Sequence, residues 1–184
     1  MFNQKRKRIF LLGTILIVSF LYTQIEYLFS HVEETIAAEK VGVNIEDFAP
    51  NIVGETLNGE SFELEKLRGK KVILNFFATW CYPCQEEMPL ISRLIQHLPA
   101  NEIEFVAINL TSQENSMKDI TPFLNHFKAE LDPVLDVDGD IMNTYRIIGI
   151  PTTFILDEEG MIIERVDGPL TKELIERVLS VSIH

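Results

Sequence analysis

Hydrophobic positions along the chain follow two contrasting patterns. From residue 9 to residue 29 they are nearly continuous, whereas from residue 44 onward they form short runs separated by polar turns. In that second region, residues 72–77 and 104–110 are almost uninterrupted apolar runs of strand length, which is typical of parallel strands buried on both faces. The pattern predicts an apolar N-terminal segment followed by a folded domain with a buried sheet.

Helical spacing alternates with these strands in the folded region. The Asn58-Gly59 pair is a strong turn signal for a hairpin near its beginning, and Thr171 can cap the last helix. The order of elements predicts an α/β fold in which helices cover both faces of a mixed central sheet. The predicted strands are 51–56, 60–64, 72–77, 104–110, 132–135, 152–156 and 161–166, and the predicted helical segments are 63–68, 81–97, 115–128, 140–146 and 171–180.

The N-terminal apolar run predicts a membrane anchor. Residues 9–29 would span about 31 Å as one helix, close to the thickness of a hydrocarbon core. The basic residues at positions 5–8 place the N-terminus in the cytoplasm and the rest of the chain outside. A cleaved signal peptide is the alternative, but small residues suited to cleavage first appear at Ile36-Ala37-Ala38, far from the run. The predicted organisation of this single-pass cell-membrane protein is a cytoplasmic segment 1–8, a transmembrane anchor 9–29, a tether 30–43 and one extracytoplasmic domain over 44–184.

The charge balance narrows the choice of partners. The chain has 16 basic and 28 acidic residues, which give it a formal net charge of -12. Four of the basic residues precede the apolar run, and Glu26 is the only acidic residue before position 33. Residues 30–184 therefore carry 12 basic and 27 acidic groups, a net charge of -15. A surface of this sign repels nucleic acid, so we expect no nucleic-acid partner.

The only two cysteines lie in the sequence Trp80-Cys81-Tyr82-Pro83-Cys84, which follows a predicted buried strand and begins a predicted helix. Backbone N–H groups and the dipole at a helix N-terminus favour an anion, so Cys81 should ionise readily and present an exposed sulfur. Cys84 lies one turn inward, where it can attack a mixed disulfide made by Cys81. Pro83 suits the first helical turn, which needs no N–H at that position. The pair predicts thiol–disulfide exchange.

Three other roles for the cysteine pair explain the pattern less well. A structural disulfide that closes so short a loop would add little stability. A zinc site would need two further ligands, and His97, His126 and His184 are not spaced for one. Two ordinary core thiols would not need a strand before them and a helix after them. The sequence accordingly predicts neither a metal nor another cofactor.

The motif and its surroundings resemble the thioredoxin superfamily, and within it the membrane-anchored thiol-disulfide oxidoreductases typified by TlpA and ResA. The similarity runs from about residue 44 to residue 180 and includes a helix-and-strand insert near 112–135. It implies a thioredoxin-like fold with an N-terminal β-hairpin and an αβ insert. The segments that carry it are Phe48-Ala49-Pro50, Leu67-Arg68-Gly69-Lys70, Val72 to Cys84, Glu87, Pro89 and Gly149-Ile150-Pro151-Thr152-Thr153-Phe154.

The resemblance also implies roles for residues around the dithiol. Pro151 matches a cis-proline that faces the two cysteines, and Ile150 would offer its backbone to a bound peptide. Without the resemblance, this Ile-Pro pair would predict only a turn. Trp80 would shield the site or, alternatively, pack in the core. Tyr82 and Pro83 would support the site from between the cysteines.

Glu87 is the candidate for proton transfer. It follows Cys84 by three residues and so shares a helix face with it. A partly buried carboxylate there would raise the thiol pKa values and exchange a proton with Cys84. The alternative is a solvated side chain like that of Glu86. Asn75 stands where the resemblance places a buried Asp in ordinary cytoplasmic thioredoxins, and because Asn cannot take up a proton, this departure assigns proton handling to Glu87.

The predicted activity is the reduction of disulfides in exported proteins. Tyr82 and Pro83 place no positive charge between the cysteines, so the thiolate is less stabilised and the potential should lie nearer about -270 mV than about -120 mV. The resemblance implies apocytochrome c as the substrate, during cytochrome c maturation, and a polytopic membrane thiol-transfer protein as the electron donor.

Two alternative activities stay open. One is a thiol peroxidase, because the beginning of the domain also resembles peroxiredoxins. Those enzymes carry Thr or Ser three residues before the reactive cysteine, where this chain has Ala78. The other is a non-catalytic module that binds peptides in the groove beside the cis-proline.

Overall fold

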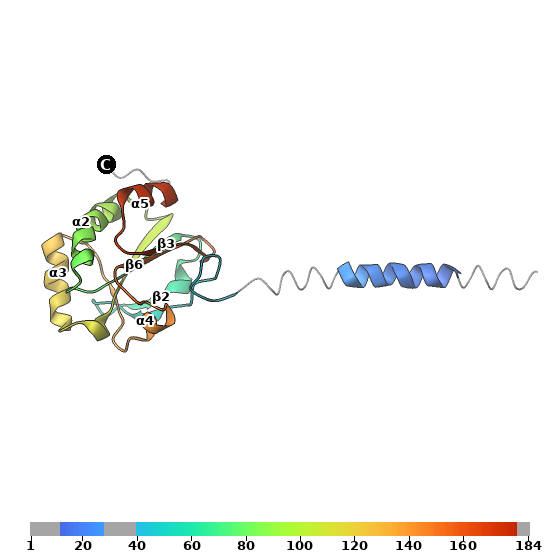
Figure 1. Cartoon of the computed structure of the whole chain (residues 1–184), viewed down its shortest axis with the longest axis horizontal. Helices are drawn as coiled ribbons and strands as arrows, with labels where there is room; N and C mark the ends of the chain where they lie inside the picture. The colour runs from blue at the N-terminus through green and yellow to red at the C-terminus, as the bar shows by residue number, and fades with distance from the viewer. Residues whose placement is uncertain (1–11, 28–39, 180–184) are drawn as a thin grey trace, which may run out of the picture. The chain divides into compact units, whose positions relative to one another are not determined.

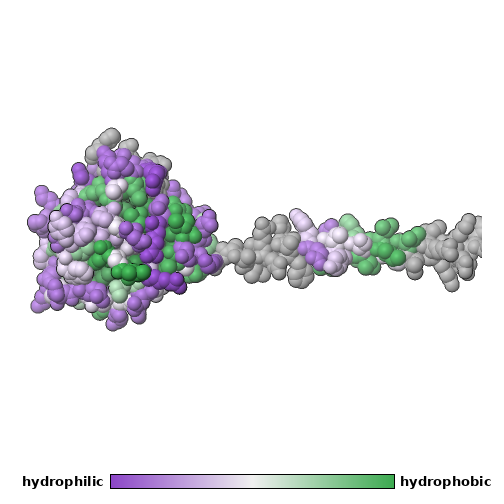
Figure 2. All heavy atoms as spheres, in the orientation of Figure 1, coloured by the Kyte–Doolittle hydropathy of each residue, from purple (hydrophilic) through white to green (hydrophobic). Residues whose placement is uncertain are grey.

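The computed structural model describes residues 12–27 and 40–179 and divides the chain into two compact units, 1–40 and 41–184 (Figure 1). In the first unit residues 12–27 form a helix whose N-terminal half is hydrophobic and whose C-terminal half is more hydrophilic (Figure 2). Among the residues described, no helix has both the length and the apolar character that a membrane crossing requires.

The predicted N-terminal organisation falls largely outside the described residues. Segment 1–8 lies wholly outside them, the expected anchor 9–29 is described only over its central part, and the tether 30–43 is described only from residue 40. Residues 180–184 also lie outside. The membrane anchor therefore stays a prediction from the sequence.

A five-stranded sheet forms the centre of the folded domain. Its strands are β3 Lys71–Phe77, β4 Ile103–Asn109, β5 Val134–Leu135, β6 Thr152–Leu156 and β7 Ile162–Asp167. Their order is β5-β4-β3-β6-β7, with β3 parallel to β4 and antiparallel to β6. The nearly continuous apolar run is thus the central strand β3, buried on both faces. The mixed sheet expected from the sequence is confirmed.

Side chains of β3 alternate between two hydrophobic cores. The elements that enclose these cores are α2 Tyr82–His97, α3 Ile120–Phe127, α4 Asp140–Thr144, α5 Lys172–Leu179, β1 Val53–Glu55 and β2 Ser61–Glu63. Ile73 and Phe77 pack with Cys84 in the core covered by α2, α3 and α5. Leu74 and Phe76 lie in the opposite core, under α4 and the β1–β2 hairpin. Helices therefore lie on both faces of the sheet, as predicted (Figure 1).

The opening hairpin confirms the turn signal at Asn58-Gly59. β1 and β2 pair in antiparallel register, and Gly59 has a φ of 84°, a left-handed conformation that glycine adopts without strain. Each of these strands has three residues, so the predicted ranges 51–56 and 60–64 are too long.

The insert between β4 and β5 differs from its prediction. Instead of one helix over 115–128, the chain forms a short 3-10 turn at Met117–Asp119 and then α3. The hydroxyl of Ser116 accepts a hydrogen bond from the N–H of Lys118 and so starts the 3-10 turn. Pro122 lies in the first turn of α3, where a missing N–H is tolerated, so the helix begins close to it rather than upstream. The predicted helix is therefore wrong over residues 115–119 and confirmed from residue 120 to residue 127.

Candidate active site

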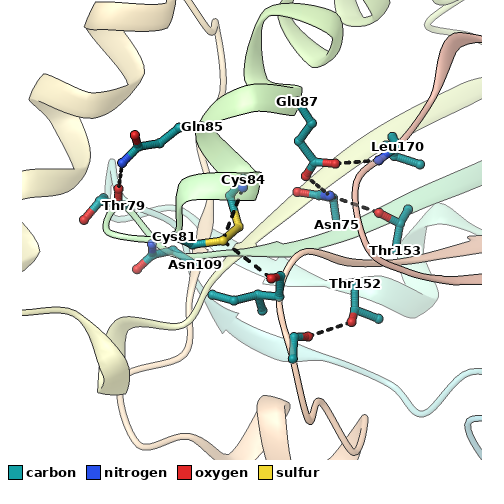
Figure 3. Close-up of a disulfide and its surroundings, with 12 residues drawn as sticks. Asn75, Thr79, Cys81, Cys84, Gln85, Glu87, Asn109, Thr152, Thr153 and Leu170 are labelled. Atoms are coloured by element: carbon teal, nitrogen blue, oxygen red, sulfur yellow. Dashed lines mark hydrogen bonds between the residues drawn. A yellow bond between two sulfur atoms is a disulfide. The ribbon is translucent and has the colours of Figure 1, made fainter.

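The cysteine motif occupies the junction between the central strand and the first helix of the domain. β3 ends at Phe77 and α2 begins at Tyr82, so Cys81 takes the N-cap position and Pro83 lies in the first turn. The Sγ of Cys81 accepts a hydrogen bond from the backbone N–H of Cys84 at 3.2 Å. The two cysteines form a disulfide with a Cα–Cα distance of 5.3 Å (Figure 3). This N–H group favours negative charge on the Cys81 sulfur after reduction.

Both cysteines are buried in the oxidised protein. Cys84 is fully buried and Cys81 is only 3% exposed, so the expectation of an exposed Cys81 sulfur is wrong. The reason is a long-range contact, because the carbonyl oxygen of Ile150 lies 3.6 Å from the Cys81 Sγ. In the reduced form the same contact lets the Cys81 thiol donate to that carbonyl. Cys81 still borders a groove, which gives a partner a route to its sulfur.

The groove beside Cys81 holds about 330 Å³ and is lined by exposed apolar side chains. Trp80 and Tyr82 are 51% and 68% exposed, and Ile148, from the loop before β6, is 96% exposed. Exposed apolar side chains that gather in this way are typical of a surface that contacts another molecule. The groove therefore suits a polypeptide that presents a disulfide to Cys81.

Trp80 belongs to the groove rather than to the core. Its indole N–H donates a hydrogen bond to the carbonyl oxygen of Gln113 at 2.8 Å, which fixes the ring against the insert. Since half of the side chain is exposed, ordinary core packing does not describe it. Its position beside the cysteines is the one that the thioredoxin resemblance implies.

The loop before β6 contains the expected cis-proline. The Ile150–Pro151 peptide bond is cis. The hydroxyl of Thr152 donates to the carbonyl of Gly149 at 2.8 Å, and the N–H of Gly168 donates to the carbonyl of Pro151 at 2.9 Å. These hydrogen bonds hold the loop in the position where its Ile150 carbonyl meets the dithiol.

Glu87 is buried next to the dithiol rather than solvated. It is 3% exposed and follows Cys84 by one turn of α2. Its carboxylate accepts hydrogen bonds from the backbone N–H of Leu170 at 2.7 Å and from the Nδ2 of Asn75 at 3.0 Å (Figure 3). Burial raises the pKa of Glu87 from 4.5 to about 7, although both hydrogen bonds act in the opposite direction. Such a carboxyl group can accept or release a proton near neutral pH.

Asn75 joins this carboxylate to the sheet. It lies on β3 opposite Thr153 of β6. Its Nδ2 donates to the Oε1 of Glu87 and to the Oγ1 of Thr153, each at 3.0 Å. In the part of the chain that the structure describes, its amide oxygen is the only buried side-chain polar atom without a hydrogen-bond partner. The resemblance places a buried Asp at this position in cytoplasmic thioredoxins. Here the Asn75 amide instead holds the carboxylate of Glu87 in place through a hydrogen bond.

A carboxylate that the sequence does not single out holds the turn before the cysteines. Glu114, from the insert, accepts hydrogen bonds from the Thr79 N–H at 2.7 Å and from the Asn109 Nδ2 at 2.8 Å, and the Thr79 hydroxyl donates to its other oxygen. We call these three residues the Glu114 network. Thr79 and Glu114 are 35 residues apart, so no local pattern could have revealed their contact.

Comparison with known proteins finds relatives over most of the chain. The model of the AhpC/TSA family matches residues 45–165. The thioredoxin-like protein YneN of Bacillus subtilis (strain 168) is 38% identical over 146 residues, which cover 79% of this chain and 85% of that protein. The thiol-disulfide oxidoreductase ResA of the same strain is 31% identical over 172 residues, which cover 94% of this chain and 92% of ResA.

A solved structure extends the similarity to three dimensions. The crystal structure of StoA from Bacillus subtilis matches with a TM-score of 0.61 at 33% identity, covering 70% of this chain and 95% of that chain. The match thus extends over almost the whole of the StoA structure. The family match includes both cysteines, Glu87 and Pro151.

Proposed function

The chain belongs to the AhpC/TSA family, has a thioredoxin-like fold and is a thiol–disulfide oxidoreductase, and from this premise we propose that it reduces disulfides in exported proteins. One observation carries the proposal. The Cys81–Cys84 pair lies at the start of α2, with Cys81 bordering an apolar groove and Cys84 enclosed behind it. This arrangement suits one cysteine for attack and the other for resolution.

Reduction proceeds in two exchange steps. The Cys81 thiolate attacks a substrate disulfide, which forms a Cys81–substrate bond and releases one substrate thiolate. Cys84 then loses its proton and attacks the Cys81 sulfur, which releases the second substrate sulfur and closes the Cys81–Cys84 disulfide. Two electrons pass to the substrate, whose two sulfurs take up protons. An external dithiol must reduce the pair again, and we assign that step to a polytopic membrane thiol-transfer protein.

Glu87 provides the proton transfer that the second step requires. Cys84 is fully buried, so its proton cannot pass directly to solvent when it attacks. The Glu87 carboxyl lies one helical turn away and has a pKa of about 7. At neutral pH it is therefore ionised in a large fraction of the molecules, and in these it can accept the Cys84 proton. The carboxyl returns the proton to Cys84 when the disulfide is reduced again.

The composition of the motif favours a reductant. Only Tyr82 and Pro83 lie between the cysteines, and neither adds positive charge that would stabilise a thiolate. The negative charge of buried Glu87 further disfavours a thiolate on Cys84. A less stabilised thiolate means a lower reduction potential. We place the reduction potential of the Cys81–Cys84 pair nearer about -270 mV than about -120 mV.

The groove favours an unfolded polypeptide as the substrate. Ile148 and Trp80 expose apolar surface that a folded hydrophilic partner would not cover. Apocytochrome c fits this description, because its haem-attachment cysteines must be thiols in an unfolded chain, and the ResA resemblance supports that choice. We accordingly propose a role in cytochrome c maturation.

We further propose that residues 9–29 anchor the protein in the cell membrane with its domain outside. The apolar run and the basic residues at positions 5–8 support this orientation. Alkaline carbonate extraction should leave the full chain in the membrane fraction, and external protease should digest the domain in spheroplasts. Removal of residues 1–29 should release the domain in soluble form. Extraction of the intact chain by carbonate would contradict the anchor.

Covalent trapping tests the exchange function. A Cys84→Ser chain should accumulate as a mixed disulfide between Cys81 and its substrate, because the resolving sulfur is gone while the attacking one remains. Non-reducing gels and mass spectrometry identify the captured protein. A Cys81→Ser chain is the matched control and should capture none of the same proteins.

Each outcome of the trapping experiment separates the candidate functions. Capture of an exported protein with paired cysteines supports the reductant. No mixed disulfide in cells, together with turnover of hydrogen peroxide by the purified chain, would identify a thiol peroxidase. Undiminished maturation of the partner in a Cys81→Ser strain would indicate a non-catalytic binding module.

A further inference from the structure

The amide oxygen of Asn75 lacks a donor in the oxidised protein. Asn75 is 1% exposed, and its Oδ1 has no hydrogen-bond partner among the described residues. The NH2 group of Asn75 donates two hydrogen bonds, one to the Oε1 of Glu87 and the other to the Oγ1 of Thr153. Buried polar atoms in folded proteins nearly always have a partner, so an unpaired one calls for an explanation.

The orientation of this amide follows from its neighbours. In the structure the NH2 group of Asn75 donates to the Glu87 carboxylate, which in its ionised form can only accept hydrogen bonds. The reverse orientation would bring the amide oxygen against a carboxylate oxygen. The free oxygen of Asn75 is therefore directed away from Glu87 and Thr153.

The free oxygen belongs to a side chain on the face of β3 that packs against the buried cysteine. Side chains of β3 alternate between faces, so Asn75 lies on the same face as Ile73 and Phe77, whose core also contains Cys84. Figure 3 shows the Asn75 oxygen on the side nearer Cys84, opposite Thr153. In the disulfide the Cys84 sulfur has no hydrogen, so it cannot donate to this oxygen.

We propose that Asn75 is a positioning residue that accepts a hydrogen bond from the Cys84 thiol in the reduced protein. Reduction breaks the Cys81–Cys84 bond, and an external dithiol supplies two electrons and two protons while it becomes a disulfide. One proton reaches Cys84 through Glu87 and makes the thiol a donor, beside an oxygen that until then lacks one. The inference rests on the proposed exchange function, since only a pair that cycles between both states uses this contact.

The contact stabilises one redox state only. Because the hydrogen bond exists in the dithiol and not in the disulfide, it shifts the equilibrium toward the reduced form. It also fixes the Cys84 thiol near the Glu87 carboxyl that receives its proton. Loss of the amide oxygen should therefore favour the disulfide, by about two- to tenfold in the equilibrium constant, the range expected for one neutral hydrogen bond.

Infrared spectroscopy can observe the hydrogen bond directly. The full chain has two cysteines, so a Cys81→Ser chain contains one thiol, that of Cys84. Its S–H stretching band should move to higher wavenumber when Asn75→Leu is added, because a freed thiol has a stiffer S–H bond. Thr153→Val is the matched control, since it removes a partner of the Asn75 NH2 group and leaves the oxygen. That control should leave the band in place.

The redox equilibrium gives an independent measurement. In the chain with both cysteines, equilibration with dithiothreitol should show the shift toward disulfide for Asn75→Leu and none for Thr153→Val. The same shift in a Glu87→Gln background excludes an indirect effect through the carboxylate. If Asn75→Leu does not fold, Asn75→Ala removes the same oxygen and carries both tests.

The outcomes separate this inference from the exchange function. An S–H band that is unchanged without the Asn75 amide, or an equilibrium that stays constant or moves toward the dithiol, would overturn the hydrogen bond. Neither result would affect capture of a substrate by Cys84→Ser. Conversely, failure to capture any substrate would refute the exchange function whatever the S–H band shows.

Discussion

At the scale of single residues, the active site contains a carboxyl group whose protonation is coupled to folding. Glu87 has a raised pKa of about 7 in the folded protein, against 4.5 ordinarily. Between these pH values the folded state binds more protons than the unfolded state. The contribution of Glu87 to stability is therefore fully present below about pH 4.5 and is lost as the pH rises through about 7.

Replacement of this carboxyl should remove that pH dependence. The free energy of unfolding of Glu87→Gln should exceed that of the unmodified protein at pH 8, by on the order of 3 kcal/mol if the full shift is expressed. The two proteins should converge below about pH 4.5. Urea denaturation across this pH range measures the difference. The exposed neighbour Glu86 supplies the control Glu86→Gln, and equal curves for all three proteins would refute the shift.

Residue identity alone predicted only part of the site. Cys81, Cys84 and Glu87 are recognisable because the motif places them on one helix. The burial of Cys81 was missed, since it depends on the Ile150 carbonyl, which belongs to a loop 69 residues away. The unpaired oxygen of Asn75 likewise depends on partners from two other elements. Such tertiary contacts leave no mark in a local pattern.

At the scale of elements, the insert after β4 acts as a support for the active-site turn. The Glu114 network joins the end of β4 to Thr79, and the neighbouring Gln113 carbonyl accepts from Trp80. Gln113 and Glu114 of the insert thus hold the turn before Cys81. Gln113 binds Trp80, and Glu114 binds Thr79. The insert therefore affects the groove although it contains neither cysteine.

Truncation of Glu114 should loosen this turn. Glu114→Ala leaves the N–H of Thr79 and the amide of Asn109 without their charged acceptor, which should destabilise the protein by about 2 kcal/mol. Alkylation of Cys81 in the reduced protein should become faster, because the turn opens more often. Glu102, an exposed residue before β4, gives the control Glu102→Ala. Unchanged stability and alkylation in Glu114→Ala would show that the network does not hold the turn.

The elements themselves differ in how well the sequence predicts them. β3 and α2 were located correctly because a continuous apolar run and the cysteine motif define them. The helix expected over 115–128 was right only from residue 120 onward, since Ser116 and Pro122 redirect the chain locally while apolar spacing continues through them. Periodicity detects the buried face of a segment but does not fix where its helix begins.

At the scale of the whole molecule, net charge should govern which substrates arrive fastest. Residues 30–184 carry a net charge of -15, so the domain attracts basic polypeptides and repels acidic ones. Long-range attraction of this kind weakens as salt shortens the screening length to about 10 Å at 0.1 M.

Matched peptides test this charge effect. The second-order rate of reduction of a basic disulfide peptide should exceed that of an acidic peptide of the same length at low ionic strength. Added salt should slow the first reaction and accelerate the second, so that the two rates converge. A neutral peptide is the control and should respond weakly. Equal rates at low salt would show that the surface charge has no part in substrate encounter.

The position of Trp80 has a practical consequence. It is the only tryptophan in the chain, and it directly precedes Cys81. Its indole is tied to Gln113 and lines the groove. Because a disulfide quenches the light emitted by a nearby indole, the intrinsic fluorescence of the protein should brighten on reduction and respond when a substrate enters. The molecule thus contains its own optical reporter, which would allow its catalytic cycle to be followed in real time without any label.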